Sequence, residues 1–485
     1  MSVRTLEPKV LWNHFADLNA VPRPSKKEER VIEFMMNFGK KLGLETKTDK
    51  IQNVIIKKPA TSGMEDRTTL ILQSHLDMVH QKNAATDFNF EEQGIEMMVD
   101  GDWVKANGTT LGADNGIGVA TIMAILSSTD IPHPALECLF TIDEETGMTG
   151  AMQLDGSNFQ GKILLNLDTE DDDELSIGCA GGIDTNTSYD YNQVAVKEYF
   201  KNFKITVNGL LGGHSGMDID KGRGNANKIL NRLLYHLYSL TEIQLLNFDG
   251  GSLRNAIPRE ATCVIAANKE EEAKLKSEVE RFFSIVNNEY KSIEPHFKII
   301  IESSSEGSLA VSYEDFEKII HTIYGVQNGV YRMSPDFDGL VEASSSLARV
   351  IVKEGKFITQ SLQRSSVESS KGDVANVIRC AFENMGCSVI QSGDYPGWEP
   401  NNDSVILKLM ADLYREMFQE EPNVKACHAG LECGILGKHL PEVDMISFGP
   451  NIRAAHSPDE KVQISSVQKF WKYFLKTVEK TPSAS

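Results

Sequence analysis

The chain has 485 residues, which is more than one hydrophobic core usually supports, so we expect two or three domains. Its 69 acidic and 49 basic side chains give a formal net charge of −20, which argues against nucleic-acid and anionic-membrane partners because both bind basic surfaces. The seven cysteines include no Cys-x-x-Cys pair, so the sequence predicts neither a disulfide scaffold nor a thiolate zinc site.

The first part of the chain alternates predicted strands with predicted helices. It begins without a secretory apolar segment and no stretch approaches transmembrane length, so the cytoplasm is the expected location. Ser25-Lys26-Lys27-Glu28 has the pattern of a capping box that opens a helix. Apolar runs predict strands at 68–72, 135–142 and 163–167. The turn at 112–118 leads into another predicted helix.

From about residue 182 the pattern changes to alternating strands of a half-exposed sheet. These strands are predicted at 204–207, 263–266, 298–301, 347–352 and 356–359, with a helix around 230–237. A Gly/Pro-rich bend at 393–397 then marks a boundary.

The C-terminal part returns to the first pattern. A helix from about Asp403, a strand at 445–448 and a final helix are predicted, the last opening at a second capping-box pattern in 465–468. Because the two ends share one style, the sequence predicts one α/β domain formed by residues 1–181 and 396–485, with a second α/β domain, 182–395, inserted between them.

Short polar motifs follow the predicted strands and turns. They are His75-Leu76-Asp77, Gly112-Ala113-Asp114-Asn115, Glu144-Glu145, Asp168-Thr169-Glu170 and Ala455-His456-Ser457-Pro458-Asp459-Glu460. In open α/β sheets, ligand sites gather at the carboxyl ends of strands, so we expect these motifs to meet. Two histidines and several carboxylates form a mixed nitrogen and oxygen ligand set that suits zinc, manganese or cobalt.

The adjacent glutamates Glu144 and Glu145 come directly after a predicted buried strand. Like charges packed together raise each other's pKa, and a divalent metal would offset that cost. One carboxylate could then be a ligand while its neighbour moves protons. A solvated turn is the more common explanation for an isolated pair, but the other motifs favour a metal site. Asp77, two residues after His75, is more naturally a hydrogen-bond partner of the imidazole than a second ligand.

Taken together, these motifs resemble those of the co-catalytic zinc peptidase clan that includes aminoacylases, carnosinases and tripeptidases, and within it the aminoacyl-histidine (Xaa-His) dipeptidases. The matching segments follow the family's order across essentially the whole chain: 75–79, 110–118, 143–147, 179–184, 212–216, 253–259, 395–398, 428–434 and 456–460. The resemblance implies a two-domain α/β fold, with a zinc-peptidase-like catalytic domain and an inserted α/β lid domain.

The resemblance also implies a ligand set for two divalent metal ions, most naturally Zn²⁺, with Co²⁺ or Mn²⁺ as alternatives. Asp114 would bridge the ions, with His75 and Asp168 on one and Glu145 and His456 on the other.

Two further residues would complete the catalytic group in the family's mechanism. Asp77 would orient the ligand histidine, and Glu144 would be the general base. A hydroxide bridging the ions would attack the peptide carbonyl, and Glu144 would pass the proton to the leaving amine.

Residues of the predicted inserted domain and its neighbourhood match substrate contacts of related dipeptidases: His214, Asn255, Arg364 and Gly430. His214 would stabilise the tetrahedral oxyanion, and Arg364 would clamp the substrate carboxylate. The alternatives are a turn histidine and a surface arginine. His80 stands where the clan usually has proline, and His428 lies in a matching loop; neither receives a role.

The predicted function is hydrolysis of unblocked dipeptides, preferentially Xaa-His and carnosine-like ones. An aminoacylase or deacetylase of the same clan is the nearest alternative, and a catalytically silent peptide-binding protein is an alternative of another class. The resemblance further implies a homodimer formed through the lid.

Overall fold

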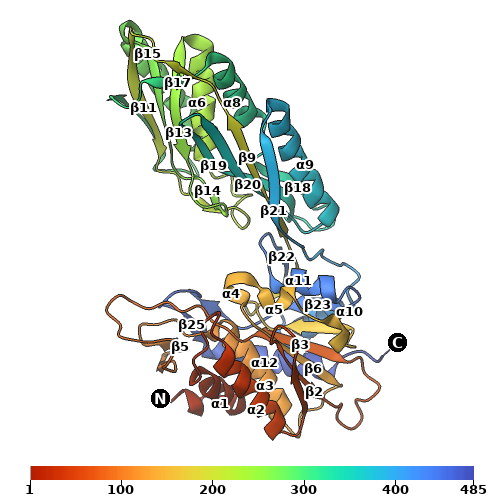
Figure 1. The fold of residues 1–485 in the computed structure, drawn as a ribbon. Helices are drawn as coiled ribbons and strands as arrows, with labels where there is room; N and C mark the ends of the chain where they lie inside the picture. The colour runs from red at the N-terminus through yellow and green to blue at the C-terminus, as the bar shows by residue number, and fades with distance from the viewer. Residues whose placement is uncertain (1, 485) are drawn as a thin grey trace. The chain divides into compact units, whose positions relative to one another are not determined.

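The computed structural model describes residues 2–484, and the chain divides into two compact units (Figure 1). Unit 1 comprises Met1–Gly178, Trp398–Ala426 and Leu431–Ser485, and unit 2 comprises Cys179–Gly397 and Cys427–Gly430. These divisions lie within a few residues of the predicted boundaries at 181/182 and 395/396. The structure also groups 427–430 with unit 2, although the sequence placed that segment in the terminal domain. That unit 2 acts as a lid stays a prediction.

Unit 1 combines helices with a mixed sheet and a small antiparallel sheet. Its helices are η1 (Val3–Thr5), α1 (Lys9–Asn19), α2 (Glu29–Lys41), α3 (Ala113–Ser127), α4 (Glu144–Gly147), α5 (Thr149–Met152), η2 (Gly156–Asn158), α10 (Val405–Phe418), α11 (Glu432–His439) and α12 (Ile464–Glu479). Its strands are β1 (Glu45–Thr48), β2 (Val54–Lys58), β3 (Leu70–His75), β4 (Met97–Asp100), β5 (Trp103–Ala106), β6 (Leu136–Thr141), β7 (Ile163–Asn166), β8 (Glu174–Cys179), β22 (Asn423–Cys427), β23 (Asp444–Ser447), β24 (Ile452–Arg453) and β25 (Lys461–Gln463).

The main sheet of unit 1 has the strand order β1-β2-β6-β3-β7-β23-β8-β22. Its central strands β6, β3, β7 and β23 run parallel, and β3, β6 and β7 are buried along their whole length. Parallel strands buried on both faces consist of continuous apolar runs, which is the pattern that predicted them. Polar site residues follow the carboxyl ends of these three strands.

Both predicted capping boxes are wrong. Helix α2 begins at Glu29 without a side-chain cap, and α12 begins at Ile464, one residue before the predicted cap. The Ser25 hydroxyl donates to Asp77 Oδ2 at 2.8 Å instead, and the Ser465 hydroxyl donates to the Asp102 carboxylate. Each serine hydroxyl therefore donates to a carboxylate distant in sequence, whereas the motif predicts that it accepts from an N–H group at the start of the helix.

Unit 2 is built on one antiparallel sheet in the order β16-β11-β15-β13-β19-β20-β9-β21, with β18 paired to β19. The strands are β9 (Gly181–Asp190), β10 (Gln193–Ala195), β11 (Phe200–Asn208), β12 (Gly213–His214), β13 (Ile243–Gly250), β14 (Ala256–Ile257), β15 (Ala261–Asn268), β16 (Lys298–Ser304), β17 (Leu309–Val311), β18 (Gly329–Met333), β19 (Val341–Lys353), β20 (Lys356–Ser365) and β21 (Ser388–Tyr395). The helices are α6 (Ala226–Leu240), η3 (Lys269–Glu271), α7 (Glu272–Tyr290), α8 (Tyr313–Gly325) and α9 (Glu368–Met385).

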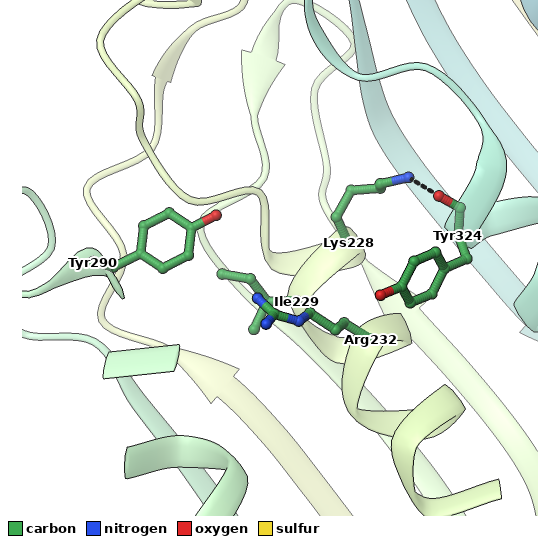
Figure 2. Close-up of a pocket in the computed structure, with 5 residues that line it drawn as sticks. All are labelled: Lys228, Ile229, Arg232, Tyr290 and Tyr324. Atoms are coloured by element: carbon green, nitrogen blue, oxygen red, sulfur yellow. Dashed lines mark hydrogen bonds between the residues drawn. The ribbon is translucent and has the colours of Figure 1, made fainter. Parts of the chain in front are cut away.

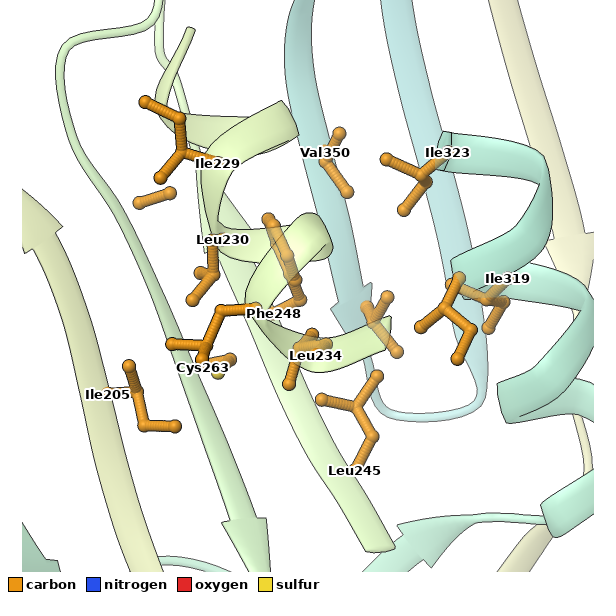
Figure 3. Close-up of a cluster of buried hydrophobic side chains, with 14 of the residues drawn as sticks. Ile205, Ile229, Leu230, Leu234, Leu245, Phe248, Cys263, Ile319, Ile323 and Val350 are labelled. Atoms are coloured by element: carbon orange, nitrogen blue, oxygen red, sulfur yellow. The ribbon is translucent and has the colours of Figure 1, made fainter. Parts of the chain in front are cut away.

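The core of unit 2 lies between this sheet and helices that include α6 and α8 (Figure 3). Alternate residues of β11 point inward, as its burial pattern shows, and Ile205 meets Leu230 and Leu234 of α6 in this cluster. Each such fully buried leucine contributes roughly 1.5–3 kcal/mol to folding. The two-residue period explains why the sequence predicted a half-exposed sheet here. None of the described helices combines the length and apolar character needed to cross a lipid bilayer.

Candidate metal centre

The predicted ligands all lie in unit 1, at the carboxyl edge of its parallel strands. They are His75 at the end of β3, Asp114 in the first turn of α3, Glu145 in α4 just after β6, Asp168 just after β7, and His456 in the loop between β24 and β25. Neighbouring parallel strands end at the same edge of a sheet, which is why residues far apart in sequence converge here.

Asp114 occupies the centre of this group. Its Oδ1 lies 3.2 Å from His75 Nε2, and its Oδ2 lies 3.1 Å from His456 Nε2. Asp168 Oδ1 lies 3.6 Å from the same nitrogen of His75, and Glu145 Oε2 lies 2.9 Å from that of His456. One carboxylate thus faces two histidines with different oxygens, a geometry compatible with its predicted bridging role.

Three overlapping groups of donor atoms lie close enough together to hold a metal ion, each within 4.8 Å. They are His75 with Asp114 and Asp168, Asp114 with Glu145 and His456, and His75 with Glu144 and Glu145. The first two contain the five ligands predicted from sequence and share Asp114. The third adds Glu144, which the sequence predicts as the base.

The electrostatics of the group fit a cation. Burial raises the pKa of Asp168 well above its usual value, and the carboxylates of Asp114 and Glu144 add to the rise. Burial likewise raises the pKa of Glu144 to about 8. Asp168 Oδ1 is buried and lacks a hydrogen-bond partner among the described residues. A divalent ion would offset the clustered negative charge and bind this oxygen, so the residues present fit a metal.

The nearby carboxylates also raise the pKa values of the two ligand histidines. Hydrogen bonds to Asp114 and Glu145 raise the pKa of His456 to about 11. Burial lowers the pKa of His75, but the carboxylates of Asp168 and Asp114 raise it by more than burial lowers it. The pKa of His75 therefore lies well above its usual value. Carboxylates that hold protons on both imidazoles would hold a cation in their place, because ligand histidines bind metals in the neutral form.

Asp77 is fully buried behind the ligands and belongs to none of the three donor groups. Its Oδ1 lies 3.3 Å from His75 Nδ1 and accepts a hydrogen bond from the Glu144 N–H at 3.1 Å. Its Oδ2 accepts from the Ser25 hydroxyl and from the Glu145 N–H. Asp77 therefore connects the β3 end to the first turn of α4, a geometry compatible with its predicted orienting role.

Sequence reasoning assigned no role to Glu432, a buried carboxylate at the start of α11. Its Oε2 accepts hydrogen bonds from the Gln73 amide at 2.7 Å and the Thr141 hydroxyl at 3.0 Å. Burial raises its pKa to about 7, and its charge contributes to the raised pKa of Glu144. Its place in the matching segment 428–434 was the available signal.

The predicted substrate contacts lie in unit 2. His214 of β12 pairs with Ala256 of β14, and the Ser215 N–H donates to the Asn255 carbonyl at 2.8 Å. The loops that hold His214 and Asn255 are therefore adjacent. Asn255 itself is exposed.

Arg364 of β20 is 4% exposed, so the surface-arginine alternative is wrong. Its Nη1 donates to the Tyr395 hydroxyl at 2.8 Å, and its Nη2 lies 3.4 Å from His214 Nε2. A Cβ added to Gly430 would lie 3.1 Å from the ring of the same tyrosine. Arg364 thus contacts both His214 and Tyr395, and Gly430 lies against the same tyrosine. Tyr395 belongs to the matching segment 395–398, but the sequence analysis assigned it no role.

Two other histidines of the sequence analysis lie outside the donor groups. His80 is exposed and its ring contacts the edge of Phe90. His428 is buried in unit 2, with Nε2 2.7 Å from the Ser344 hydroxyl. Burial, together with the nearby positive charge of Arg364, lowers the pKa of His428 to about 3. Its imidazole is therefore neutral at physiological pH.

A separate pocket in unit 2 is lined by Lys228, Ile229, Arg232, Tyr290 and Tyr324 (Figure 2). Both of its cations have partners: Lys228 Nζ donates to three backbone carbonyls at the end of α8, and Arg232 makes two hydrogen bonds to the Glu289 carboxylate. These contacts join α6 to α8 and α7, so the charges serve packing.

Comparison with known proteins identifies the family of this chain. The model of peptidase family M20/M25/M40 matches residues 71–480. The cytosol non-specific dipeptidase of Escherichia coli (strain K12) is 40% identical over 478 residues, which cover 99% of each chain. The crystal structure of aminoacylhistidine dipeptidase from Vibrio alginolyticus has a TM-score of 0.96 and 40% identity, covering 100% of this chain and 99% of that one. An aminopeptidase from Bacillus cereus, at 16% identity and a TM-score of 0.56, covers 98% of this chain and 99% of its own and shares the fold. The chain therefore belongs to peptidase family M20/M25/M40.

Proposed function

We propose that this protein is a metal-dependent dipeptidase that hydrolyses unblocked dipeptides, with a preference for Xaa-His and carnosine-like substrates. The observation that carries the proposal is the convergence of two donor groups on Asp114, with Glu144 beside them. The names of the Escherichia coli and Vibrio alginolyticus relatives support the dipeptidase class, and the second supports the histidine preference.

Two divalent ions, most naturally Zn²⁺, would occupy the two groups that share Asp114. His75 and Asp168 would complete the first site, and Glu145 and His456 the second. The nitrogen and oxygen donors suit zinc, cobalt and manganese. When bound, such ions would supply an acidified water and polarise the scissile carbonyl.

Glu144 is the general base in this proposal. Burial raises its pKa to about 8 before any cation binds, and a base whose pKa lies near the working pH both accepts and releases protons. Glu144 takes the proton of the attacking water and gives it to the leaving amine as the C–N bond breaks. Its N–H donates to Asp77, which holds the first turn of α4 in place.

His214 and Arg364 would bind the negative charges of the substrate and of the tetrahedral intermediate. The Gly216 and Met217 N–H groups donate to His214 Nδ1, which places the proton of the neutral ring on Nε2. That N–H and Arg364 Nη2 are then two donors 3.4 Å apart. A shared anion, such as a carboxylate or oxyanion, would accept hydrogen bonds from both donors. We assign Asn255 and Gly430 as further substrate contacts.

The test compares Glu144→Ala with the wild-type protein on carnosine, other Xaa-His dipeptides and N-acetyl amino acids. We expect kcat to fall by about 10²–10⁴, the usual share of general base catalysis, while both ions stay bound in elemental analysis. The matched control is Glu420→Ala at an exposed glutamate of unit 1, which should keep wild-type activity.

Retained activity in Glu144→Ala would refute the base assignment. Hydrolysis of N-acetyl amino acids in place of dipeptides would identify an aminoacylase or deacetylase instead. Tight dipeptide binding without turnover by the metal-loaded wild type would identify a silent binding protein.

We further propose a cytosolic homodimer formed through unit 2. The name of the Escherichia coli relative places that protein in the cytosol, and the resemblance to lid-paired peptidases supports the dimer. Light scattering should then give twice the mass of one chain. Dipeptides are the expected partners, since a net charge of −20 disfavours nucleic acids and anionic membranes.

A further inference from the structure

Glu460 is a buried carboxylate at the end of the loop that carries His456. Its two oxygens accept hydrogen bonds from four consecutive backbone N–H groups of the turn that begins α3 and carries Asp114. Oε2 accepts from Leu111 and Gly112 at 2.7 and 2.9 Å, and Oε1 accepts from Ala113 and Asp114 at 2.8 and 3.2 Å. The Glu460 side chain thus links the loop that carries His456 to the backbone of the turn that carries Asp114.

Arg23, which is 1% exposed, is a second buried charge that contacts the same turn. Its Nη2 donates to the Gly112 carbonyl at 2.6 Å and to Asn19 Oδ1 at 3.0 Å. Its Nη1 donates to the carbonyls of Leu76 and Asp77 at 3.0 and 3.1 Å. Arg23 therefore ties the turn to the chain that directly follows His75.

Physical chemistry explains why these residue types stand here. The backbone leaves the helical conformation at Asp114 and Asn115, so the N–H groups from Leu111 to Asp114 have no regular helical acceptors. Buried N–H groups need a hydrogen-bond partner, and a carboxylate is a strong one. A guanidinium offers several donors in a fixed fork, so it can hold carbonyls of two segments at once. In the described turn, Glu460 takes the N–H groups and Arg23 takes the Gly112 carbonyl, so its backbone is held on both sides.

We infer that Glu460 and Arg23 are positioning residues that set the spacing of the segments bearing His75, Asp114 and His456. Glu460 fixes the pair Asp114 and His456, and Arg23 fixes Asp114 relative to the β3 end. The inference rests on the proposed function, because the spacing matters only if these residues bind the ions. Neither side chain is itself a ligand; each acts through backbone contacts.

The test uses Glu460→Gln, which keeps the shape but turns an amide NH₂ toward backbone donors. Its matched control is Asp459→Asn, the same charge change at the exposed neighbouring residue. Chelator-stripped proteins are titrated with Co²⁺, whose visible absorption reports ligand geometry. For the variant we expect one ion with wild-type affinity and the ion at Asp114, Glu145 and His456 bound about 10- to 100-fold more weakly, with an altered spectrum. Asp459→Asn should match the wild type.

Hydrogen exchange of the metal-free protein gives a readout that depends on neither ions nor turnover. The four amides from Leu111 to Asp114 should exchange about ten- to hundredfold faster in Glu460→Gln, because hydrogen bonds to a charged acceptor are lost. In the loaded enzyme kcat should fall more than KM changes, since substrate contacts are untouched.

Wild-type protein that binds no Co²⁺ would refute the proposed function. Wild-type protein that binds two ions, with Glu460→Gln identical in affinity and spectrum, would overturn the inference alone. If Glu460→Gln does not fold, Arg23→Lys decides: it keeps the buried charge but loses the fork, and unchanged Co²⁺ affinity there overturns the inference.

Discussion

His75 and His428 are both buried histidines, yet their surroundings move their pKa values in opposite directions. Burial disfavours the charged form of each, but around His75 the carboxylates of Asp168 and Asp114 outweigh it and raise the pKa. Around His428 burial acts together with the positive charge of Arg364, and its pKa falls to about 3. The neighbours of a histidine, more than its burial, thus decide its charge.

The depressed pKa of His428 predicts a pH dependence of stability. The unfolded chain, with a pKa near 6.5, binds a proton below that pH that the folded protein does not. The stabilising contribution is therefore present above pH 6.5 and is lost as pH falls toward 3, by up to about 1.4 kcal/mol per pH unit. His428→Asn should flatten this dependence in thermal unfolding followed between pH 7 and 4.

The control is His296→Asn, at an exposed histidine of unit 2, which should keep the wild-type slope. If stability depends on pH equally in the wild type and in His428→Asn, the depressed pKa of His428 does not cause that dependence.

At the scale of elements, helix α3 sets the position of Asp114 against the sheet. Nearly every residue from Ala113 to Leu126 is buried, because the helix packs between α1 and β3. Gly118 permits this close packing. A Cβ there would lie 2.5 Å from Ser74 Oγ and 2.6 Å from the Leu167 carbonyl oxygen, on the strand ends that carry His75 and Asp168.

Gly118→Ala should destabilise the protein by about 1–3 kcal/mol through overpacking and weaken metal binding by displacing α3. Gly372→Ala in α9 is the matched change, because a Cβ there meets nothing within 4 Å. It should stabilise the fold by about 0.5–1 kcal/mol through the higher helix propensity of alanine. Denaturant unfolding measures both; a Gly118→Ala variant as stable as wild type would contradict the packing argument.

At the scale of the whole molecule, unit 1 gathers partly buried carboxylates that repel one another without a cation. Asp114, Glu144, Glu145 and Asp168 lie together around two histidines, and the raised pKa values of Glu144 and Asp168 record the cost. Folding therefore places strain at the site that metal binding would relieve.

Removal of metal with a chelator should abolish peptidase activity and lower the thermal midpoint. Adding Zn²⁺, Co²⁺ or Mn²⁺ at about 100 times its dissociation constant should restore activity and stabilise the protein by about 2.7 kcal/mol per ion site. Mg²⁺, which demands octahedral oxygen ligands, should restore neither. Full activity in protein shown by elemental analysis to lack such ions would contradict the metal assignment.

The sequence alone determined the α/β class and the positions of the buried strands, because continuous apolar runs such as 135–142 are typical of strands in a sheet covered on both faces. Histidines and carboxylates after strand ends also predicted a metal site, while the individual ligands were assigned from the family resemblance and stay a prediction. Local patterns failed where a distant partner competed: Ser25 donates to Asp77 rather than to a helix end.

Only the tertiary structure decided how those ligands are held. Glu460 meets the turn at Asp114 across some 350 residues of chain, and Arg23 spans from the N-terminal region to the same turn. No periodicity or short motif encodes such contacts, because hydrogen bonds between buried groups depend on where whole elements pack. The residue types in the sequence therefore predict a metal site, while the spacing of its predicted ligands follows from the assembled fold.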